Sequence, residues 1–270
     1  MSNACYVHGY SESEYTRMRD QSRTLAELLH FDTRYPAGAH VLEAGCGIGA
    51  QTVILARNSP EARFTCIDIA PQSIAQAQRA VTTAGFQNVE FQVADILNLP
   101  FGDESFDHVF VCFVLEHLSR PMDALLGLKR VLKPGGTITV IEGDHGSTFF
   151  YPRSERAMRT IQCLVELQAR LGGNALIGRE LHPLLTRAGF ADVTVSPRFV
   201  YAVPSRPDWV EGFTIKTFIA MVEGVREQAI ESGLIDPTTW DQGIADLWAT
   251  AGPDGVFCYT FFKATARKKA

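Results

Sequence analysis

The chain has 270 residues, of which 46% are hydrophobic and 20% are charged. This balance is ordinary for a globular protein and allows a sizeable core. The formal net charge of −5 argues against DNA or RNA as the main partner, because phosphate binding favours a basic face.

The hydrophobic pattern, the N-terminal segment and the cysteines indicate the cellular compartment. No apolar run approaches the length of a membrane span, and the opening MSNACYVHGYSESEY has neither a basic nor an apolar signal region. We therefore expect no membrane segment and no signal peptide. The cysteines form no CxxC pair and no zinc-type cluster with histidines, so we expect no metal and a reducing cytoplasm.

The first predicted element is a helix over about residues 16–30. Leu25, Leu28 and Leu29 fall at i, i+3 and i+4, which is typical of one apolar helix face. Pro36-Ala37-Gly38 then ends the segment. We expect residues 1–36 to form an N-terminal helical cap and residues 37–270 to form the main domain.

From residue 39, short β-branched runs alternate with helical stretches. This alternation predicts a mainly parallel sheet that is covered by helices on both faces. The predicted strands are Val41–Ala44, Arg63–Ile69, Val89–Ala94, Phe106–Phe113 and Thr137–Glu142. The predicted helices are Gln51–Asn58, Ser73–Ala84 and Arg120–Leu132.

The last third of the chain is less regular. Its predicted helices are Ser154–Leu171, Gly178–Ala188, Pro207–Gly233 and Pro237–Ala251, and its predicted strands are Val193–Val203 and Phe257–Ala264. The two helices before the last strand read as an insertion over about residues 205–252, which would suit a lid over a substrate.

A glycine-rich turn follows the first strand. Gly45, Gly47 and Gly49 fall on alternate residues, so a ligand could lie against bare backbone N–H groups at the start of the next helix. Gly45-x-Gly47-x-x-Ala50 fits the dinucleotide fingerprint, and Asp68 lies 23 residues on (68 − 45). The turn therefore predicts a nucleotide-like cofactor, and an NAD-dependent oxidoreductase remains an alternative.

Further features accompany the turn: Glu43 before the glycines, Asp95 after the third strand, the segment 100–107 before the fourth strand, Val114–Leu118 after it, and Leu132–Gly136. In this order and spacing the set resembles the class I S-adenosylmethionine-dependent methyltransferases of the small-molecule type. The resemblance covers roughly residues 39–145.

The resemblance implies an α/β fold: a seven-stranded, mostly parallel Rossmann-like sheet with helices on both faces. The final strand would lie antiparallel between strands five and six. The fold would carry the N-terminal cap and the helical insertion before the last strand.

The resemblance also implies a set of cofactor contacts for S-adenosyl-L-methionine, which would leave as S-adenosyl-L-homocysteine. Gly45, Gly47 and the backbone of Cys46 would contact the methionyl part. Asp68 would bind the ribose hydroxyls, Ile69 would pack beside the adenine, and Asp95 and the Ile96 backbone would bind the adenine edge. The Cys112 carbonyl would receive the methionyl ammonium, Gln51 would reach the carboxylate, and Tyr10 would close over the cofactor.

The methyl acceptor would lie beyond the end of strand five. Asp144 and His145 are expected there as catalytic residues, because a histidine can take a proton from an attacking hydroxyl, amine or activated carbon near neutral pH. Aromatic residues of the insertion, such as Trp209, Phe213 and Phe218, suit a hydrophobic or aromatic small molecule. For most of them, a place in the core or in the interface of a homo-oligomer is the preferred interpretation.

The function predicted from the sequence is methyl transfer to carbon, nitrogen or oxygen of a small organic acceptor, such as a natural product of secondary metabolism. A non-catalytic S-adenosylmethionine-binding module is the other alternative to the oxidoreductase.

Overall fold

A seven-stranded sheet forms the centre of the computed structural model, which describes residues 12–270. Its strand order is β3-β2-β1-β4-β5-β7-β6. Strands β1 to β5 run parallel, and β7 runs antiparallel between β5 and β6. The strands are β1 (His40–Ala44), β2 (Arg63–Asp68), β3 (Val89–Val93), β4 (Phe106–Cys112), β5 (Leu132–Tyr151), β6 (Ala191–Ala202) and β7 (Val256–Arg267). The predicted mostly parallel, seven-stranded sheet is confirmed.

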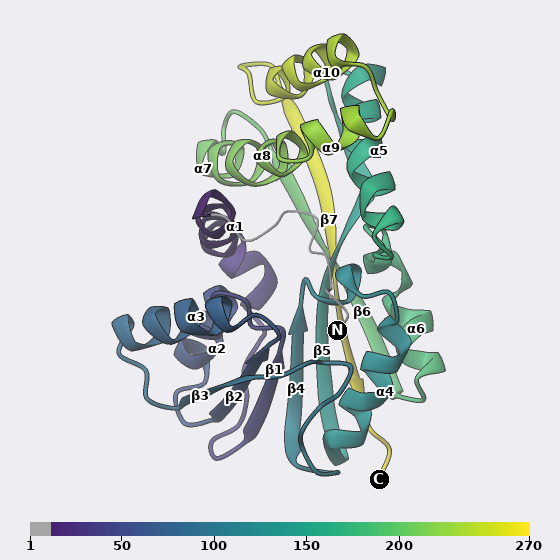
Figure 1. The fold of residues 1–270 in the computed structure, drawn as a ribbon. Helices are drawn as coiled ribbons and strands as arrows, with labels where there is room; N and C mark the ends of the chain where they lie inside the picture. The colour runs from purple at the N-terminus through teal and green to yellow at the C-terminus, as the bar shows by residue number, and fades with distance from the viewer. Residues whose placement is uncertain (1–11) are drawn as a thin grey trace.

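Helices cover both faces of this sheet (Figure 1). One face carries α2 (Ala50–Asn58) and α3 (Pro71–Thr83), and the other carries α4 (Pro121–Val131) and α6 (Leu181–Arg187). The remaining helices outside the insertion are α1 (Glu12–His30), η1 (Leu115–His117), α5 (Glu155–Arg170) and η2 (Ile177–Glu180). The core is therefore divided into two apolar clusters, one on each face of the sheet.

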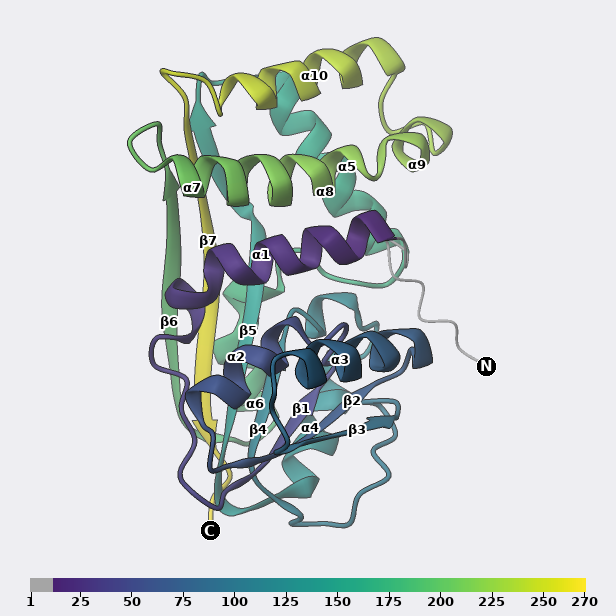
Figure 2. The same cartoon turned by 90° about the vertical axis from the view of Figure 1, so that its left-hand side faces the viewer.

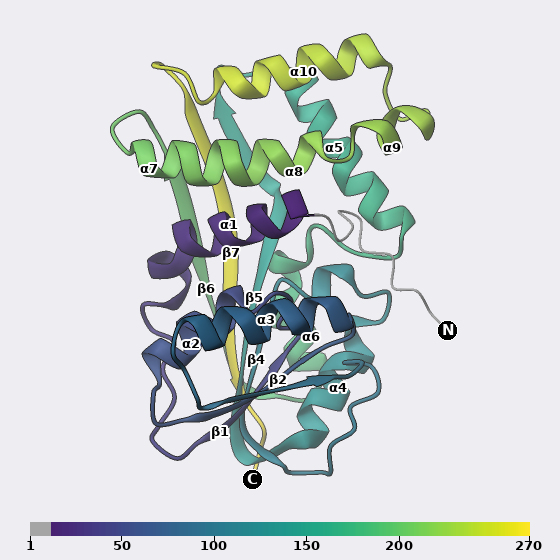
Figure 3. The same ribbon diagram turned by 60° about the vertical axis from the view of Figure 1, so that its left-hand side comes forward.

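The insertion between β6 and β7 lies beyond the carboxyl ends of the parallel strands. It consists of α7 (Pro207–Trp209), η3 (Val210–Ile219), α8 (Ala220–Glu223), α9 (Arg226–Glu231) and α10 (Pro237–Ala249). Helix α1 runs between the insertion and the pair α2–α3 (Figures 2 and 3). It approaches η3 closely, since a Cβ at Gly212 would overlap the side chain of Thr24. The cap and the insertion thus cover the same edge of the sheet.

Two elements differ from the sequence predictions. Strand β5 does not end at Glu142 but continues to Tyr151, because its second half pairs with β7 after a shift in register between Asp144 and Phe149. The predicted single helix Pro207–Gly233 is interrupted and contains a π-helical stretch, η3. In η3 the Thr217 hydroxyl donates to the carbonyl of Gly212, five residues earlier, at 2.7 Å.

A buried lysine fixes the end of the cap to the sheet. The Lys263 ammonium on β7 donates to the Leu29 carbonyl at 3.1 Å, and to Asp32 and the Thr33 hydroxyl at 2.6 Å. Arg198 on β6 forms a second ion pair with Asp32. Burial lowers the pKa of Lys263, and the Asp32 carboxylate opposes that shift. These contacts hold the carboxyl end of α1 where the cap can cover the site.

The glycine turn offers a matched test of the packing. Gly49 has φ +78° and a Cβ there would lie 2.8 Å from the Ala77 Cα, whereas Gly85 has φ +81° and open space. Gly49→Ala should lower the free energy of unfolding by about 2–5 kcal/mol through backbone strain and overpacking. Gly85→Ala should cost about 1–2 kcal/mol, from strain alone. Urea unfolding measures both, and equal losses would contradict the close approach of α2 and α3.

Candidate active site

A cavity of about 250 Å³ opens at the carboxyl ends of the parallel strands. Its floor comes from residues that follow β1, β2, β3 and β4, and its roof comes from α1 and η3. This is the edge at which open α/β sheets bind ligands. The lining includes ten of the twelve residues proposed from the sequence: Gly45, Cys46, Gly47, Gln51, Asp68, Ile69, Asp95, Ile96, Cys112 and His145.

The glycine turn presents its backbone to this cavity. The N–H groups of Gly45 and Cys46 donate to the Ile67 carbonyl at 2.8 and 2.9 Å, which ties the turn to the end of β2. Gly45 has φ +80°, and a Cβ there would overlap the Val114 side chain. Only glycine combines this conformation with this close approach, so Gly45 lets the turn pack directly against Val114.

Asp68 links the turn to the start of α3. Its carboxylate accepts from the Gly47 N–H and from the Ala70 N–H, each at 2.9 Å. Burial raises the pKa of Asp68, and these backbone donors oppose the shift. Each carboxylate oxygen has a second lone pair, so Asp68 keeps the capacity to accept from a ligand.

A second carboxylate lies along the same edge. One oxygen of Asp95 accepts from the Leu97 N–H at 2.9 Å, which shapes the turn after β3. Ile69 also lines the cavity and is 44% exposed. Ile69 and Asp95 thus contribute an apolar side chain and a carboxylate to the same cavity.

Gln51 is oriented by the cap. Its side-chain oxygen lies 2.8 Å from Nε2 of His30. Burial lowers the pKa of His30 to about 4, so the ring is neutral and donates from Nε2 to this oxygen. The Nδ1 of His30 is then a buried acceptor, and no partner bonds it within the described chain. The Gln51 amide N–H groups remain available to donate into the cavity.

Glu43 supports the turn from beneath. It is buried, and its carboxylate accepts from the Thr52 hydroxyl at 2.6 Å and from the Cys66 thiol at 3.2 Å. Burial raises the pKa of Glu43 to about 7, although both hydrogen bonds favour the ionised form. The residue thus fixes the first turn of α2 to β1 rather than facing the ligand.

The opposite end of the cavity is aromatic. Phe213 and Phe218 of η3 and Tyr259 and Phe261 of β7 line it. Their rings form one continuous cluster, with Phe213 5.5 Å from Tyr259 and Phe218 5.6 Å from Tyr259. Alternation along β7 directs residues 257, 259 and 261 to the same side of the sheet. This end suits an apolar molecule.

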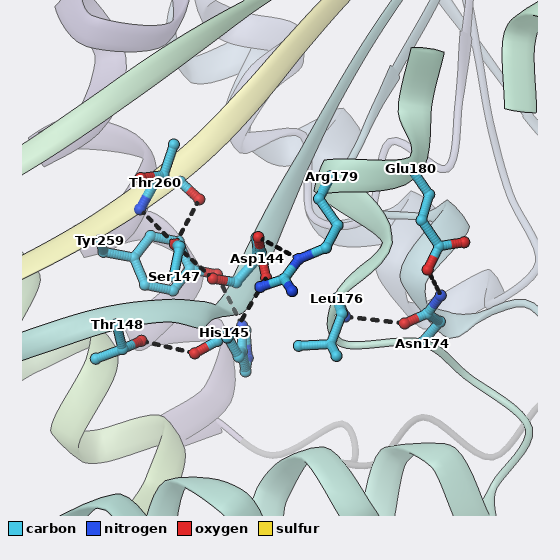
Figure 4. Close-up of polar contacts among 11 residues, drawn as sticks. Asp144, His145, Ser147, Thr148, Asn174, Leu176, Arg179, Glu180, Tyr259 and Thr260 are labelled. Atoms are coloured by element: carbon cyan, nitrogen blue, oxygen red, sulfur yellow. Dashed lines mark hydrogen bonds and ion pairs between the residues drawn. The ribbon is translucent and has the colours of Figure 1, made fainter. Parts of the chain in front are cut away.

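His145 and Asp144 point in different directions (Figure 4). His145 lines the cavity, and its Nδ1 lies 2.7 Å from the Tyr259 hydroxyl. Asp144 is buried, and it is not one of the residues that line the cavity. Its carboxylate accepts two hydrogen bonds from Arg179, each at 2.8 Å, and one from the Gly146 N–H. Asp144 thus contacts η2 through Arg179, and its catalytic role stays a prediction.

Tyr10 lies outside the described residues. The sequence did not identify Tyr259 as a site residue, although the strong alternation of Phe257–Ala264 indicates one inward face on the last strand. Helix α1 also contributes to the lining, through Tyr15, Arg17, Met18 and Gln21.

Comparison with known proteins agrees with this geometry. Residues 42–140 match the family described as "Methyltransferase domain". A demethylmenaquinone methyltransferase of Tropheryma whipplei is 38% identical over 116 residues, which are 43% of this chain and 46% of that protein. An uncharacterized protein of a Streptomyces fradiae transposon is 36% identical over 59% of this chain and 46% of that protein. The chain spans about half the length of the curated relatives it matches.

Solved structures share the fold at low identity. A putative methyltransferase from Bacillus halodurans has a TM-score of 0.59 at 18% identity, over 91% of this chain and 99% of that one. The [4+2]-cyclase SpnF has a TM-score of 0.56 at 21% identity, over 93% and 82%.

The chain thus has the class I methyltransferase fold. Residues 42–140 match the methyltransferase-domain family, and the resemblance found in the sequence is confirmed. Within residues 12–270, no helix is long and apolar enough to cross a membrane. The same residues contain no group of three His, Cys, Asp or Glu side chains placed to hold a metal ion.

Glu43 gives a pH-dependent test of the supporting layer. Its folded-state pKa of about 7 lies above the ordinary 4.5, so its contribution to stability is present below 4.5 and is lost as pH rises through 7. Glu43→Gln cannot ionise, so its stability relative to the wild type should rise by up to about 3 kcal/mol across that window. Urea unfolding at several pH values measures this difference, with Glu61→Gln, at an exposed position, as the control. A pH-independent difference would contradict the buried, protonated carboxyl.

Proposed function

We propose that this chain is an enzyme that transfers a methyl group from S-adenosyl-L-methionine to a small, largely apolar organic acceptor. The observation that carries the proposal is the single cavity that joins the glycine turn and Asp68 at one end to the aromatic wall and His145 at the other. When bound, the cofactor supplies an activated methyl group on a sulfonium. The protein then has to hold donor and acceptor in line, which can supply much of the rate.

The proposed cofactor contacts follow the cavity from the turn outward. The backbone of Gly45, Cys46 and Gly47 would hold the methionyl part, the Gln51 amide would donate to its carboxylate, and the Cys112 carbonyl would accept from its ammonium. Asp68 would accept from both ribose hydroxyls. Ile69, Asp95 and the Ile96 N–H would hold the adenine. The free lone pairs of Asp68 and the free amide protons of Gln51 support this assignment. Tyr10 remains a predicted cofactor contact.

The acceptor would occupy the aromatic end beneath the insertion, which we propose acts as the substrate lid. Its apolar walls support a hydrophobic or aromatic acceptor, and the T. whipplei relative is named for demethylmenaquinone. Geranyl diphosphate methyltransferase, a fold neighbour with a TM-score of 0.57 at 15% identity, is named for an apolar chain that also carries a diphosphate. Four points stay predictions: methylation at carbon, nitrogen or oxygen, a role in secondary metabolism, a cytoplasmic location, and assembly into homo-oligomers.

The fold also hosts other chemistry, as the cyclase neighbour illustrates, so the cofactor is tested first. Calorimetry with S-adenosyl-L-homocysteine should give saturable binding, and NADH should give none. Asp68→Asn removes the charge from the ribose contact. It should raise the dissociation constant about 10–150-fold, the equivalent of about 1.5–3 kcal/mol. Asp103→Asn, at an exposed position that pairs with Arg130, is the matched control.

A thermal melt of each variant verifies the fold, since Asp68 also holds the turn. An unchanged dissociation constant in folded Asp68→Asn protein would remove Asp68 from the proposed site. Binding of NADH in place of S-adenosyl-L-homocysteine would overturn the proposed function.

A further inference from the structure

The pair His145–Tyr259 is the polar feature of the aromatic end. His145 Nδ1 and the Tyr259 hydroxyl lie 2.7 Å apart, although the two residues are 114 positions apart in the chain. Gly143 makes this possible, because a Cβ at that position would collide with the Tyr259 hydroxyl. Figure 4 shows the two side chains directed toward one another, while Asp144 faces Arg179. The local backbone is therefore built around this contact.

The direction of the proton follows from what each group can do. Burial raises the pKa of Tyr259 well above its usual value, so the phenol keeps its proton, and burial lowers the pKa of His145, so the ring is neutral. If Nδ1 donated, the phenolic proton would have to find another acceptor, and no other one bonds it among residues 12–270. A buried donor without a partner costs about 1–3 kcal/mol. The phenol therefore donates to Nδ1, and the ring proton lies on Nε2.

The second ring nitrogen is open to the cavity. Within the described chain, Nε2 of His145 has no hydrogen-bond partner. It is also not one of the fully buried side-chain nitrogen and oxygen atoms that lack a partner, so it is accessible. Since His145 lines the cavity, its accessible nitrogen faces that space. The Phe218 ring lies 5.9 Å from the imidazole ring. An Nε2–H group thus stands as a donor against an apolar wall.

The cationic side chains at this site are limited. Among the described lining residues, Arg17 is the one lysine or arginine, and its guanidinium already donates to the Glu14 carboxylate at 2.6 and 2.7 Å. A phosphate or carboxylate on the acceptor would therefore be buried in the cavity without a lysine or arginine of the described lining free to pair with it. The site favours a neutral molecule with a polar oxygen.

We propose that Tyr259 is a positioning residue that holds His145 as the Nε2–H tautomer, and that this N–H donates to a carbonyl-type oxygen of a neutral, apolar acceptor. This role differs from the proton-accepting role expected from the sequence. The acceptor part rests on the proposed function, whereas the tautomer does not. The pair then orients the acceptor in the cavity through this hydrogen bond.

Nitrogen-15 NMR of histidine-labelled protein tests the tautomer directly, because protonated and unprotonated ring nitrogens resonate far apart. His145→Gln assigns the signal. The wild type should show protonated Nε2 and unprotonated Nδ1, and Tyr259→Phe should shift His145 toward a mixture of tautomers. Tyr201→Phe, which removes an exposed hydroxyl from the same sheet, should change nothing. A wild-type signal with protonated Nδ1 would overturn the proposal, and this result needs no variant to fold.

Three probes test the donor role in the same samples, saturated with S-adenosyl-L-homocysteine. Acetophenone carries a carbonyl oxygen, propylbenzene carries no polar atom, and benzoate carries a charge. Acetophenone should shift the His145 Nε2 resonance more than either of the others. A shift equal to that from propylbenzene, or a larger one from benzoate, would overturn the acceptor class. Failure of S-adenosyl-L-homocysteine to bind would overturn the proposed function and leave the tautomer result standing.

Discussion

The two hydrogen bonds that the Asp68 carboxylate accepts from Gly47 and Ala70 are the constraint on which the site depends. They join the turn after β1 to the start of α3 after β2. Hydrogen bonds to a charged group contribute about 1.5–3 kcal/mol, which is enough to hold a glycine-rich turn in one conformation. Because the turn is fixed from this side, its remaining backbone and the second lone pairs of Asp68 are presented to the cavity without rearrangement.

The sheet order determines how the two ends of the cavity meet. Strand β7 enters antiparallel between β5 and β6, so its inward residues Tyr259 and Phe261 lie beside His145 on β5. The cap contributes from the other side, where Lys263 holds the end of α1 and His30 orients Gln51. The donor end is therefore built mostly by local turns, whereas the acceptor end is built by strands and helices that are far apart in sequence.

This difference explains how much the sequence could predict. The glycine turn, Asp68 and Asp95 are local signals at strand ends, and their placement on one edge follows from a parallel sheet. The length of β5 could not be predicted, because residues 149–151 become strand only through pairing with β7. The orientation of Asp144 depends on Arg179, 35 positions away, and the π-helical stretch η3 has no signature in a 3.6-residue pattern. The inward direction of Tyr259 could be predicted, because the last strand alternates between residues that face the core and residues that face away.

A crystal structure of the protein with S-adenosyl-L-homocysteine would show whether one cavity holds the cofactor at the glycine turn and leaves its sulfur facing His145. We expect ribose density against Asp68, adenine between Ile69 and Asp95, and the sulfur directed toward the aromatic end. Adenosine bound at the aromatic end, or density away from the glycine turn, would contradict this placement.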